Sequence, residues 1–278
     1  MTLRKWLSTY PLTVIMIVCW IAGGAYFGST GLYKKVEAYQ NAPVAENMLD
    51  KLSASDEKIV PAYIVDPQWT KNSSRTAQAG KTGVFSKVDQ SYLDDAVFIG
   101  DSRTDTLHLY AGWDNAAYYV KTGTNIWSIM SDTVKVDGKS MTIEKALGKK
   151  KFGKVYIMLG VNELGSGTAE SFYQQFKSVV KKIRKLQPDA IIFVESIMHV
   201  TSKVSASSKS ITNGAINTRN KLLRKLADNE TIFFIDENTA LDDENGALTA
   251  KYTFDGIHLE AKYIGPWKEF ILSHGVVR

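Results

Sequence analysis

A serine near the middle of the sequence and a histidine near its end stand in contexts in which their side chains can do chemistry together. Ser102 follows the apolar run 96–99 after one Gly-Asp pair, and Asp255 precedes His258 by three residues. A serine hydroxyl is a poor nucleophile until a base takes its proton, and His258 is the candidate base. A carboxylate on the same turn, Asp255, can bind the other ring nitrogen and stabilise the imidazolium.

The same chemistry needs hydrogen-bond donors for the negative charge of a tetrahedral intermediate. The backbone N–H groups of Ser102 and Gly123 and the side-chain amide of Asn162 are donors of the right type. Gly112 is an alternative to Gly123, which we prefer because it closes a predicted strand. We therefore expect an oxyanion hole made by Ser102, Gly123 and Asn162.

Alternating apolar runs and helical patterns predict the elements that position these residues. Five short apolar runs are interpreted as buried strands: 96–100, 116–123, 154–160, 190–196 and 231–236. Helical spacing is found over 168–187 and over about 209–228, with Leu222, Leu223 and Leu226 facing the sheet, and a third helix follows His258. This alternation predicts a parallel sheet with helices on both faces, and ligands bind such sheets at the carboxyl ends of the strands.

The ordered set Gly100-Asp101-Ser102, Gly123, Gly160-x-Asn162 and Asp255-x-x-His258 resembles the GDSL/SGNH hydrolase superfamily over residues 94–275. The resemblance implies an α/β fold, specifically a flavodoxin-like three-layer sandwich with a five-stranded parallel sheet. It also implies ester hydrolysis or acyl transfer with no metal and no cofactor. Ser102 would be the nucleophile, His258 the base and Asp255 the residue that orients the base, while Ser102, Gly123 and Asn162 would form the oxyanion hole.

Two residues depart from the pattern of that superfamily. Glu163 stands where the third block usually has Asp, so we expect different hydrogen bonding at the rim of the sheet. Arg103 follows the serine where the superfamily usually has Leu. Two interpretations of Arg103 remain open: it binds an anionic group of the substrate, or it is a surface arginine bonded to the rim.

Other polar and aromatic residues have simpler interpretations. His199 follows the fourth predicted strand and can line the rim, with a substrate role as the alternative, whereas His274 is expected to be solvated. Asp236 ends the fifth predicted strand and rivals Asp255 as a partner for the base. Trp113 and Trp127 are most simply packing residues, although Trp113 can also serve as a platform for a sugar ring.

An apolar segment without charges, residues 10–28, lies near the N-terminus between basic residues. It is long enough to cross a bilayer, and we favour an uncleaved anchor over a cleaved signal peptide. The predicted organisation is an N-terminal membrane anchor over residues 1–30, a stalk or linker over 31–90 and the hydrolase domain over 91–278. Either interpretation of the segment places the domain outside the cytoplasm.

Charge and cysteine usage exclude other classes of protein. The net charge of +5 is due mostly to four basic residues that flank the apolar segment, so the rest of the chain is nearly neutral. Nucleic-acid binding therefore has little support. Cys19 is the single cysteine, which excludes a disulfide within the chain and a metal site built from cysteines.

These observations predict a membrane-anchored, extracytoplasmic serine esterase or acyltransferase. Its substrate would be an O-acylated carbohydrate of the cell envelope, or another small ester, with acetyl as the expected acyl group. A membrane acyltransferase is a possible partner. The alternative is a catalytically inactive relative that binds polysaccharide or serves as the partner of such an acyltransferase; Glu163 favours it, and the intact Ser102, Asp255 and His258 argue against it.

Overall fold

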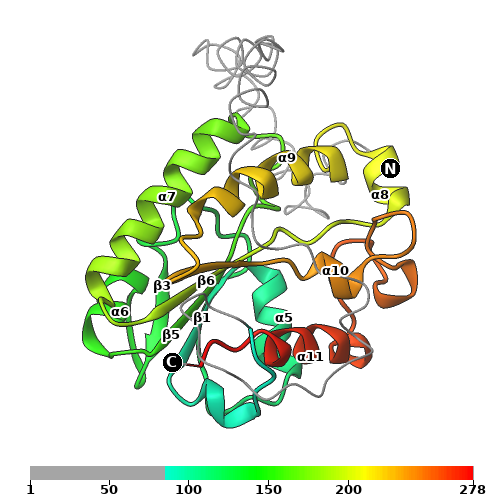
Figure 1. Cartoon of the computed structure of the whole chain (residues 1–278). Helices are drawn as coiled ribbons and strands as arrows, with labels where there is room; N and C mark the ends of the chain where they lie inside the picture. Colours follow the sequence, from blue (N-terminus) through cyan, green and yellow to red (C-terminus); the bar gives the residue numbers. More distant parts are fainter. Residues whose placement is uncertain (1–84, 278) are drawn as a thin grey trace, which may run out of the picture. The chain divides into compact units, whose positions relative to one another are not determined.

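Five parallel strands form the central sheet in the computed structural model, which describes residues 85–277 (Figure 1). Their order is β2-β1-β5-β6-β7. The strands are β1 (Ala96–Gly100), β2 (Ala117–Val120), β5 (Lys154–Met158), β6 (Ile191–Glu195) and β7 (Ile232–Ile235). Each predicted apolar run contains one of them. Counted along the chain within this sheet, the order is 2-1-3-4-5, which is the doubly wound arrangement of flavodoxin-like folds.

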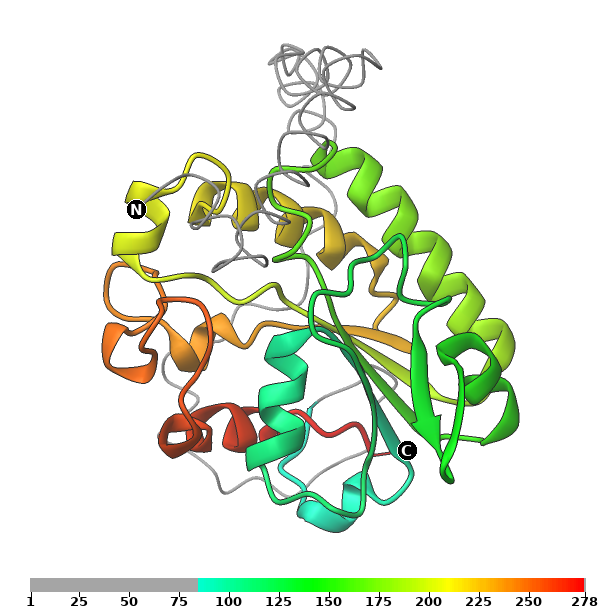
Figure 2. The ribbon, with the colours of Figure 1, turned by 180° about the vertical axis from the view of Figure 1, so that it is seen from behind.

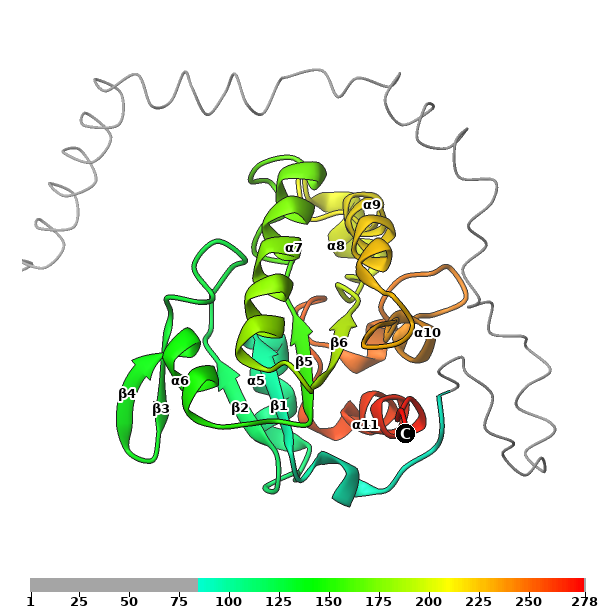
Figure 3. The ribbon, with the colours of Figure 1, turned by 60° about the vertical axis from the view of Figure 1, so that its left-hand side comes forward.

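Helices cover both faces of the sheet, as Figures 1 and 2 show. One face carries α6 (Ile143–Lys149), α7 (Ala169–Leu186) and α9 (Asn213–Leu223), and the other carries α5 (Ser102–Tyr110) and α11 (Gly265–Ser273). A hairpin of β3 (Thr133–Val136) and β4 (Lys139–Thr142) packs against α6 at one side of the molecule (Figure 3). The short helices are η2 (Gln90–Leu93), α8 (Ser202–Ser207), η3 (Arg224–Leu226), α10 (Asn238–Leu241), η4 (Ala250–Tyr252) and η5 (Ala261–Tyr263).

Side chains that alternate along each strand divide the core into two layers. On the face of α5 and α11, a row of aromatic rings crosses all five strands in register: Tyr118, Phe98, Tyr156, Phe193 and Phe233. The ring centroids of Phe98 and Tyr156 lie 4.6 Å apart, and those of Tyr156 and Phe193 lie 4.5 Å apart. The opposite face carries the branched aliphatic residues against which α7 and α9 pack. Because a shift of one residue would move this row to the other face, the row helps to fix the register.

The predicted helices are present with some differences in length. Thr168 caps α7 through the backbone N–H of Ser171, as the predicted start of this helix required. The second helix is shorter than expected, since α9 ends at Leu223 and continues as the single turn η3. Of the three leucines predicted to face the sheet, Leu223 is fully buried and Leu226 packs against the core, but Leu222 is only half-buried.

The predicted anchor over residues 1–30, with its segment 10–28, lies outside the described residues, as does most of the stalk over 31–90. Near the start of the described chain, Ser86 exchanges two backbone hydrogen bonds with Gly275, at 2.7 and 3.0 Å. No helix between residues 85 and 277 combines the length and the apolar character that a membrane span needs.

The chain that follows β6 remains buried although it has left the sheet, so its backbone groups need other partners. Two asparagines of α9 supply them. The side chain of Asn220 accepts the N–H of Ile197 at 2.8 Å and donates to its carbonyl at 2.9 Å. In the same way Asn213 binds the N–H and the carbonyl of Val200, both at 2.9 Å. Each amide side chain therefore takes the place of a neighbouring strand.

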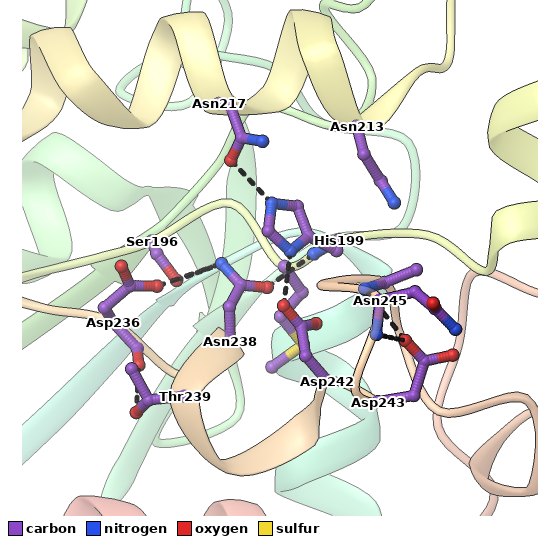
Figure 4. A network of polar contacts seen from close by, with 12 residues as sticks. Ser196, His199, Asn213, Asn217, Asp236, Asn238, Thr239, Asp242, Asp243 and Asn245 are labelled. Carbon is purple, nitrogen blue, oxygen red and sulfur yellow. Dashed lines mark hydrogen bonds and ion pairs between the residues drawn. The ribbon is translucent and has the colours of Figure 1, made fainter. Parts of the chain in front are cut away.

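Asn238 and His199 complete this network (Figure 4). The side chain of Asn238 accepts the backbone N–H of His199 at 2.6 Å. The two ring nitrogens of His199 lie 2.7 Å from Asp242 Oδ2 and 2.7 Å from Asn217 Oδ1. The network joins α9, α10 and the segment 196–201, which we call the support segment.

We expect Asn220→Ala to destabilise the domain, because the buried N–H of Ile197 loses the partner that the structure gives it. The free energy of unfolding should fall by about 1–3 kcal/mol, the cost of a buried donor without a partner. Lys221→Ala, at the exposed neighbouring position of α9, is the control and should change it by less than about 0.5 kcal/mol. Equal urea midpoints for the two variants would contradict the role of the asparagine.

Candidate active site

Ser102 is the first residue of α5 and is separated from the end of β1 by Asp101 alone. A side chain at Gly100 would collide with Thr104 of α5 and with the backbone of β5, so glycine lets the helix start close to the sheet. Asp101 is the N-cap, and its carboxylate accepts the N–H of Arg103 at 2.9 Å. The Gly-Asp-Ser sequence therefore ends a buried strand, caps a helix and holds the serine at the carboxyl edge of the sheet.

The structure brings Ser102, His258 and Asp255 together in hydrogen-bonding sequence. Ser102 Oγ lies 2.8 Å from His258 Nε2, although the two residues are 156 positions apart. His258 Nδ1 lies 2.7 Å from Asp255 Oδ2. A carboxylate can only accept, so Nδ1 carries the hydrogen and Nε2 is left to accept the serine proton.

Asp255 is fixed by the turn that it shares with His258. Its Oδ1 accepts the N–H groups of Ile257 and His258, both at 2.8 Å, and the hydroxyl of Thr253 at 3.1 Å. Partial burial disfavours the charged carboxylate, but the hydrogen bonds from the backbone and ring of His258 outweigh it and hold the pKa of Asp255 at about 2. Asp255 is therefore ionised at every pH at which histidines titrate.

Gly256 allows this turn to dock on the support segment. Its φ is +83°, a conformation that side chains rarely adopt, and a Cβ there would lie 2.7 Å from Thr201 Oγ1. The N–H of Thr201 donates to the carbonyl of Gly256 at 3.0 Å. The turn that carries Asp255 and His258 thus takes its position from the chain after β6.

The candidate oxyanion donors come from three loops at one edge of the sheet. As the first residue of α5, Ser102 has an N–H without a partner inside the helix. Gly123 lies exposed in the turn after β2, with a φ of +76°. Asn162 follows β5, and its Nδ2 donates to the carbonyl of Thr124 at 2.8 Å. This bond joins the loops of Gly123 and Asn162 and leaves one amide N–H of Asn162 for a ligand.

Glu163, which departs from the superfamily pattern, is fully buried behind these loops. Its Oε1 accepts the N–H of Ile126 at 2.6 Å. The pKa of Glu163 is raised to about 7: burial and the charge of Asp101 raise it, while the hydrogen bond from the Ile126 N–H and the charge of Arg219 lower it. The expected difference in rim bonding is therefore a buried carboxylate bonded to the backbone of the neighbouring loop.

The prediction that Arg103 lies on the surface is wrong, because its side chain is almost completely buried. Its Nη1 donates to the carbonyl of Met198, in the support segment, at 2.6 Å. Burial lowers the pKa of Arg103 to about 10, partly offset by the charges of Asp101 and Asp255. A buried guanidinium does not meet an anionic substrate group from solvent, so Arg103 braces the start of α5 instead.

Two other histidines differ from their predicted roles. His199 is buried and both ring nitrogens are bound within the network of Figure 4, so it has no free donor or acceptor for a substrate. The prediction that His274 is solvated is wrong: its ring stacks on Phe270 with centroids 3.9 Å apart, and burial lowers its pKa.

Asp236 and Trp113 have structural roles. Asp236 accepts hydrogen bonds from Arg224 and Asn238, both at 3.0 Å, rather than from a histidine. Trp113 is 2% exposed and stacks on Phe98, which excludes it as a sugar platform. Trp127 is 45% exposed beside the loop of Gly123, so it is a rim residue rather than a core residue.

Sequence reasoning missed Thr253 and Thr201, which hold the turn of Asp255. The hydroxyl of Thr253 accepts the N–H of Gly256 at 2.9 Å and donates to Asp255. A threonine two residues before an aspartate and three before a glycine is a local signal for such a turn. Thr201 gives no comparable local signal, because its partner lies far along the chain.

The chain belongs to the GDSL-like lipase/acylhydrolase family, whose model matches residues 98–262. A structure from Streptococcus pneumonia named for platelet activating factor is similar, with 19% identity and a TM-score of 0.51, over 64% of this chain and 82% of that chain. At this identity it shows a shared fold.

Two further solved structures match over similar lengths. A GDSL-like lipase from Bacteroides thetaiotaomicron VPI-5482 has 15% identity and a TM-score of 0.48, over 67% of this chain and 89% of that chain. An acetyl-xylooligosaccharide esterase from Geobacillus Stearmophilus has 13% identity and a TM-score of 0.47, over 66% and 95%. No curated protein matched the sequence.

Asp255→Asn should preserve the fold and reduce the turnover of an ester substrate by on the order of 10⁴-fold, because an amide does not hold the proton on Nδ1 or stabilise the imidazolium. Turnover of p-nitrophenyl acetate is the measurement. Asp105→Asn is the matched control, since Asp105 binds the exposed His108 on α5 at 3.2 Å. Less than a tenfold loss in Asp255→Asn would contradict the assigned role.

Glu163→Gln should make the stability of the domain less sensitive to a rise in pH from 5 to 8. The pKa of Glu163 is raised from 4.5 to about 7, so the folded protein keeps a proton that the unfolded chain loses between these values. Stability therefore falls as pH rises through this window, and the advantage of the variant should grow by about 2–3 kcal/mol between pH 5 and pH 8. Urea unfolding at both values measures it, and an unchanged difference would refute the titration.

Proposed function

We propose that this protein is a serine esterase or O-acyltransferase that acts through an acyl-enzyme on small O-acyl groups, acetyl above all, of cell-envelope carbohydrate. The observation that carries the proposal is the chain of contacts from Ser102 Oγ to His258 Nε2, at 2.8 Å, and from His258 Nδ1 to Asp255 Oδ2, at 2.7 Å. This is the arrangement that activates a serine hydroxyl.

In the first half of the reaction, Ser102 Oγ attacks the ester carbonyl carbon while His258 Nε2 takes the hydroxyl proton. The carbonyl oxygen becomes an oxyanion. When the tetrahedral intermediate collapses, the bond to the alcohol oxygen breaks and His258 returns the proton to that oxygen. The alcohol leaves, and the acyl group stays on Ser102 as an ester.

In the second half, a water molecule or an acceptor hydroxyl attacks the acyl-serine and gives its proton to His258. Collapse of this intermediate returns the proton to Ser102 Oγ. Water yields a free carboxylic acid, whereas an acceptor hydroxyl yields a new ester. Hydrolysis and transfer therefore share every protein group and differ only in the acceptor.

Charge separation accompanies each step, and the site has groups suited to both charges. Asp255, ionised because its pKa is about 2, faces the imidazolium of His258. The N–H groups of Ser102 and Gly123 and the free amide N–H of Asn162 are the donors proposed for the oxyanion. Loss of one such donor typically costs about 3 kcal/mol of the barrier.

The apolar segment near the N-terminus supports a carbohydrate substrate and a location outside the cytoplasm. An anchor at residues 10–28 would hold the domain outside the cytoplasm, where envelope glycans are the abundant acyl acceptors and donors. In that setting a membrane acyltransferase is the partner that would deliver acyl groups. The nearly neutral charge of the chain beyond its N-terminal segment suits an uncharged sugar ester better than a nucleic acid.

Ser102→Ala tests the proposal directly. The full-length protein in detergent should hydrolyse p-nitrophenyl acetate and be labelled by a serine-directed phosphonate, and the variant should lose the label and at least about 10⁴-fold in kcat. Ser91→Ala, an exposed serine of η2, is the control and should retain both. Wild-type protein that neither turns over the ester nor takes the label would favour the non-enzymatic alternative.

The same preparation separates hydrolysis from transfer. Oligosaccharide acceptors are added at increasing concentration, and the products are weighed by mass spectrometry. Acylated glycan that increases with acceptor, together with an equal loss of free acid, identifies a transferase; free acid alone identifies an esterase.

A further inference from the structure

The loop that carries Gly123 is held by two sets of hydrogen bonds. Asp132 accepts from the hydroxyls of Thr124 and Ser128 within the same loop. The turn after β5 binds the loop through two adjacent residues. Asn162 donates to the carbonyl of Thr124 at 2.8 Å, and Glu163 accepts the N–H of Ile126 at 2.6 Å.

The two side chains that make these bonds differ in whether they can also contact a substrate. Asn162 donates one amide N–H to the loop and has a second one available for a ligand. The bond to the loop therefore also fixes the orientation of the amide group. Glu163 is 0% exposed and reaches only the backbone of the loop. It therefore does not touch the substrate, and any effect it has on the reaction passes through the position of the loop.

We propose that Glu163 is a positioning residue of the oxyanion hole, whose buried carboxylate holds the Gly123 loop in register with Asn162. The two donors come from separate loops after β2 and β5, and their separation decides whether one oxygen can be bound by both. The hydrogen bond from Ile126 to Glu163, with the bond from Asn162 to Thr124, sets that separation. The inference rests on the proposed function, since it assigns Glu163 to the same reaction.

The surroundings of Glu163 compensate its buried carboxylate poorly. Its Oε2 has no hydrogen-bond partner among the described residues. Arg219 of α9 donates to the backbone carbonyl of Glu163, at 3.4 Å, rather than to the carboxylate. Burial, together with the negative charge of Asp101, raises the pKa of Glu163 to about 7. A group this poorly compensated contributes little stability, which leaves the bond to Ile126 as its visible task.

An interaction that only places oxyanion donors acts in the transition state and not on the bound ester. Loss of the Glu163 contact should therefore lower kcat and leave KM nearly unchanged. Glutamine has the same length and still offers a carbonyl oxygen to the Ile126 N–H, so it should restore what alanine loses.

The experiment compares Glu163→Ala and Glu163→Gln in the full-length protein, with kcat and KM for p-nitrophenyl acetate at pH 8. We expect alanine to reduce kcat by about 10- to 100-fold with KM within threefold, and glutamine to recover kcat to within about threefold of the wild type.

Gln187→Ala is the matched control for loss of a buried side-chain clamp. Gln187 is buried at the end of α7, accepts the N–H of Phe152 at 2.9 Å and donates to the carbonyl of Lys150 at 2.7 Å, before the first residue of β5. It should lower the urea midpoint, because buried backbone groups lose their partners, and it should leave kcat unchanged.

Three results would overturn the inference: an unchanged kcat in Glu163→Ala, an equal loss in Gln187→Ala, or no recovery in Glu163→Gln. Labelling of Ser102 by the phosphonate distinguishes these from failure of the proposed function. If wild-type protein takes no label, the proposed function fails; if it does and any of the three results is found, only the role of Glu163 fails.

Discussion

The hydrogen bond between Ser102 and His258 is the constraint on which the rest of this structure depends. Ser102 is the first residue of α5, the helix after β1, whereas His258 lies near the C-terminus. No local structure therefore brings them together. Ser102 cannot adjust, because β1 is paired on both sides, with β2 and with β5. A proton passes between heavy atoms only at hydrogen-bond distance, and a displacement of 1 Å is enough to lose much of the rate. The fold therefore has to bring His258 to a fixed serine.

Both partners of that bond use the same support. The turn of His258 is tied to the support segment by the bond from Thr201 to the carbonyl of Gly256, and α5 is tied to it by the bond from Arg103 to the carbonyl of Met198. A shift of the segment would therefore move both partners together. Amide side chains from α9 and α10 hold the segment where a sixth strand would otherwise be needed. An irregular segment held in this way is as well bonded as a strand, yet it leaves its outer edge free to receive the catalytic turn.

The parts that could be predicted from the sequence are those that depend on neighbours along the chain. The five strands were recognisable because a strand buried on both faces is a continuous apolar run, and α7 because its apolar residues repeat at helical spacing. The Asp-x-x-His spacing likewise predicted that two side chains share one turn, because the two residues are close along the chain. Arg103 was misplaced because its burial depends on a carbonyl 95 residues away, and the position of Glu163 depends on Ile126, 37 residues away. The hairpin β3–β4 was missed although Asp137 and Gly138, both at positive φ, give the Asp-Gly signal of a tight turn.

Buried charge at this edge of the sheet is better explained by geometry than by stability. Asp101 and Glu163 are buried acids whose pKa values are both raised by burial, and the charge of Asp101 also raises the pKa of Glu163; an oxyanion would add another negative charge nearby. Two buried arginines oppose them, Arg103 beside Asp101 and Arg219 beside Glu163. Well-packed apolar residues would in general make a fold at least as stable as such charges do. What the charges supply is direction, because each accepts or donates at one backbone group: Asp101 at the start of α5, Arg103 at the support segment and Glu163 at the loop of Gly123. The start of α5, the support segment and the loop of Gly123 are thus each held by a directional contact from a buried charged side chain.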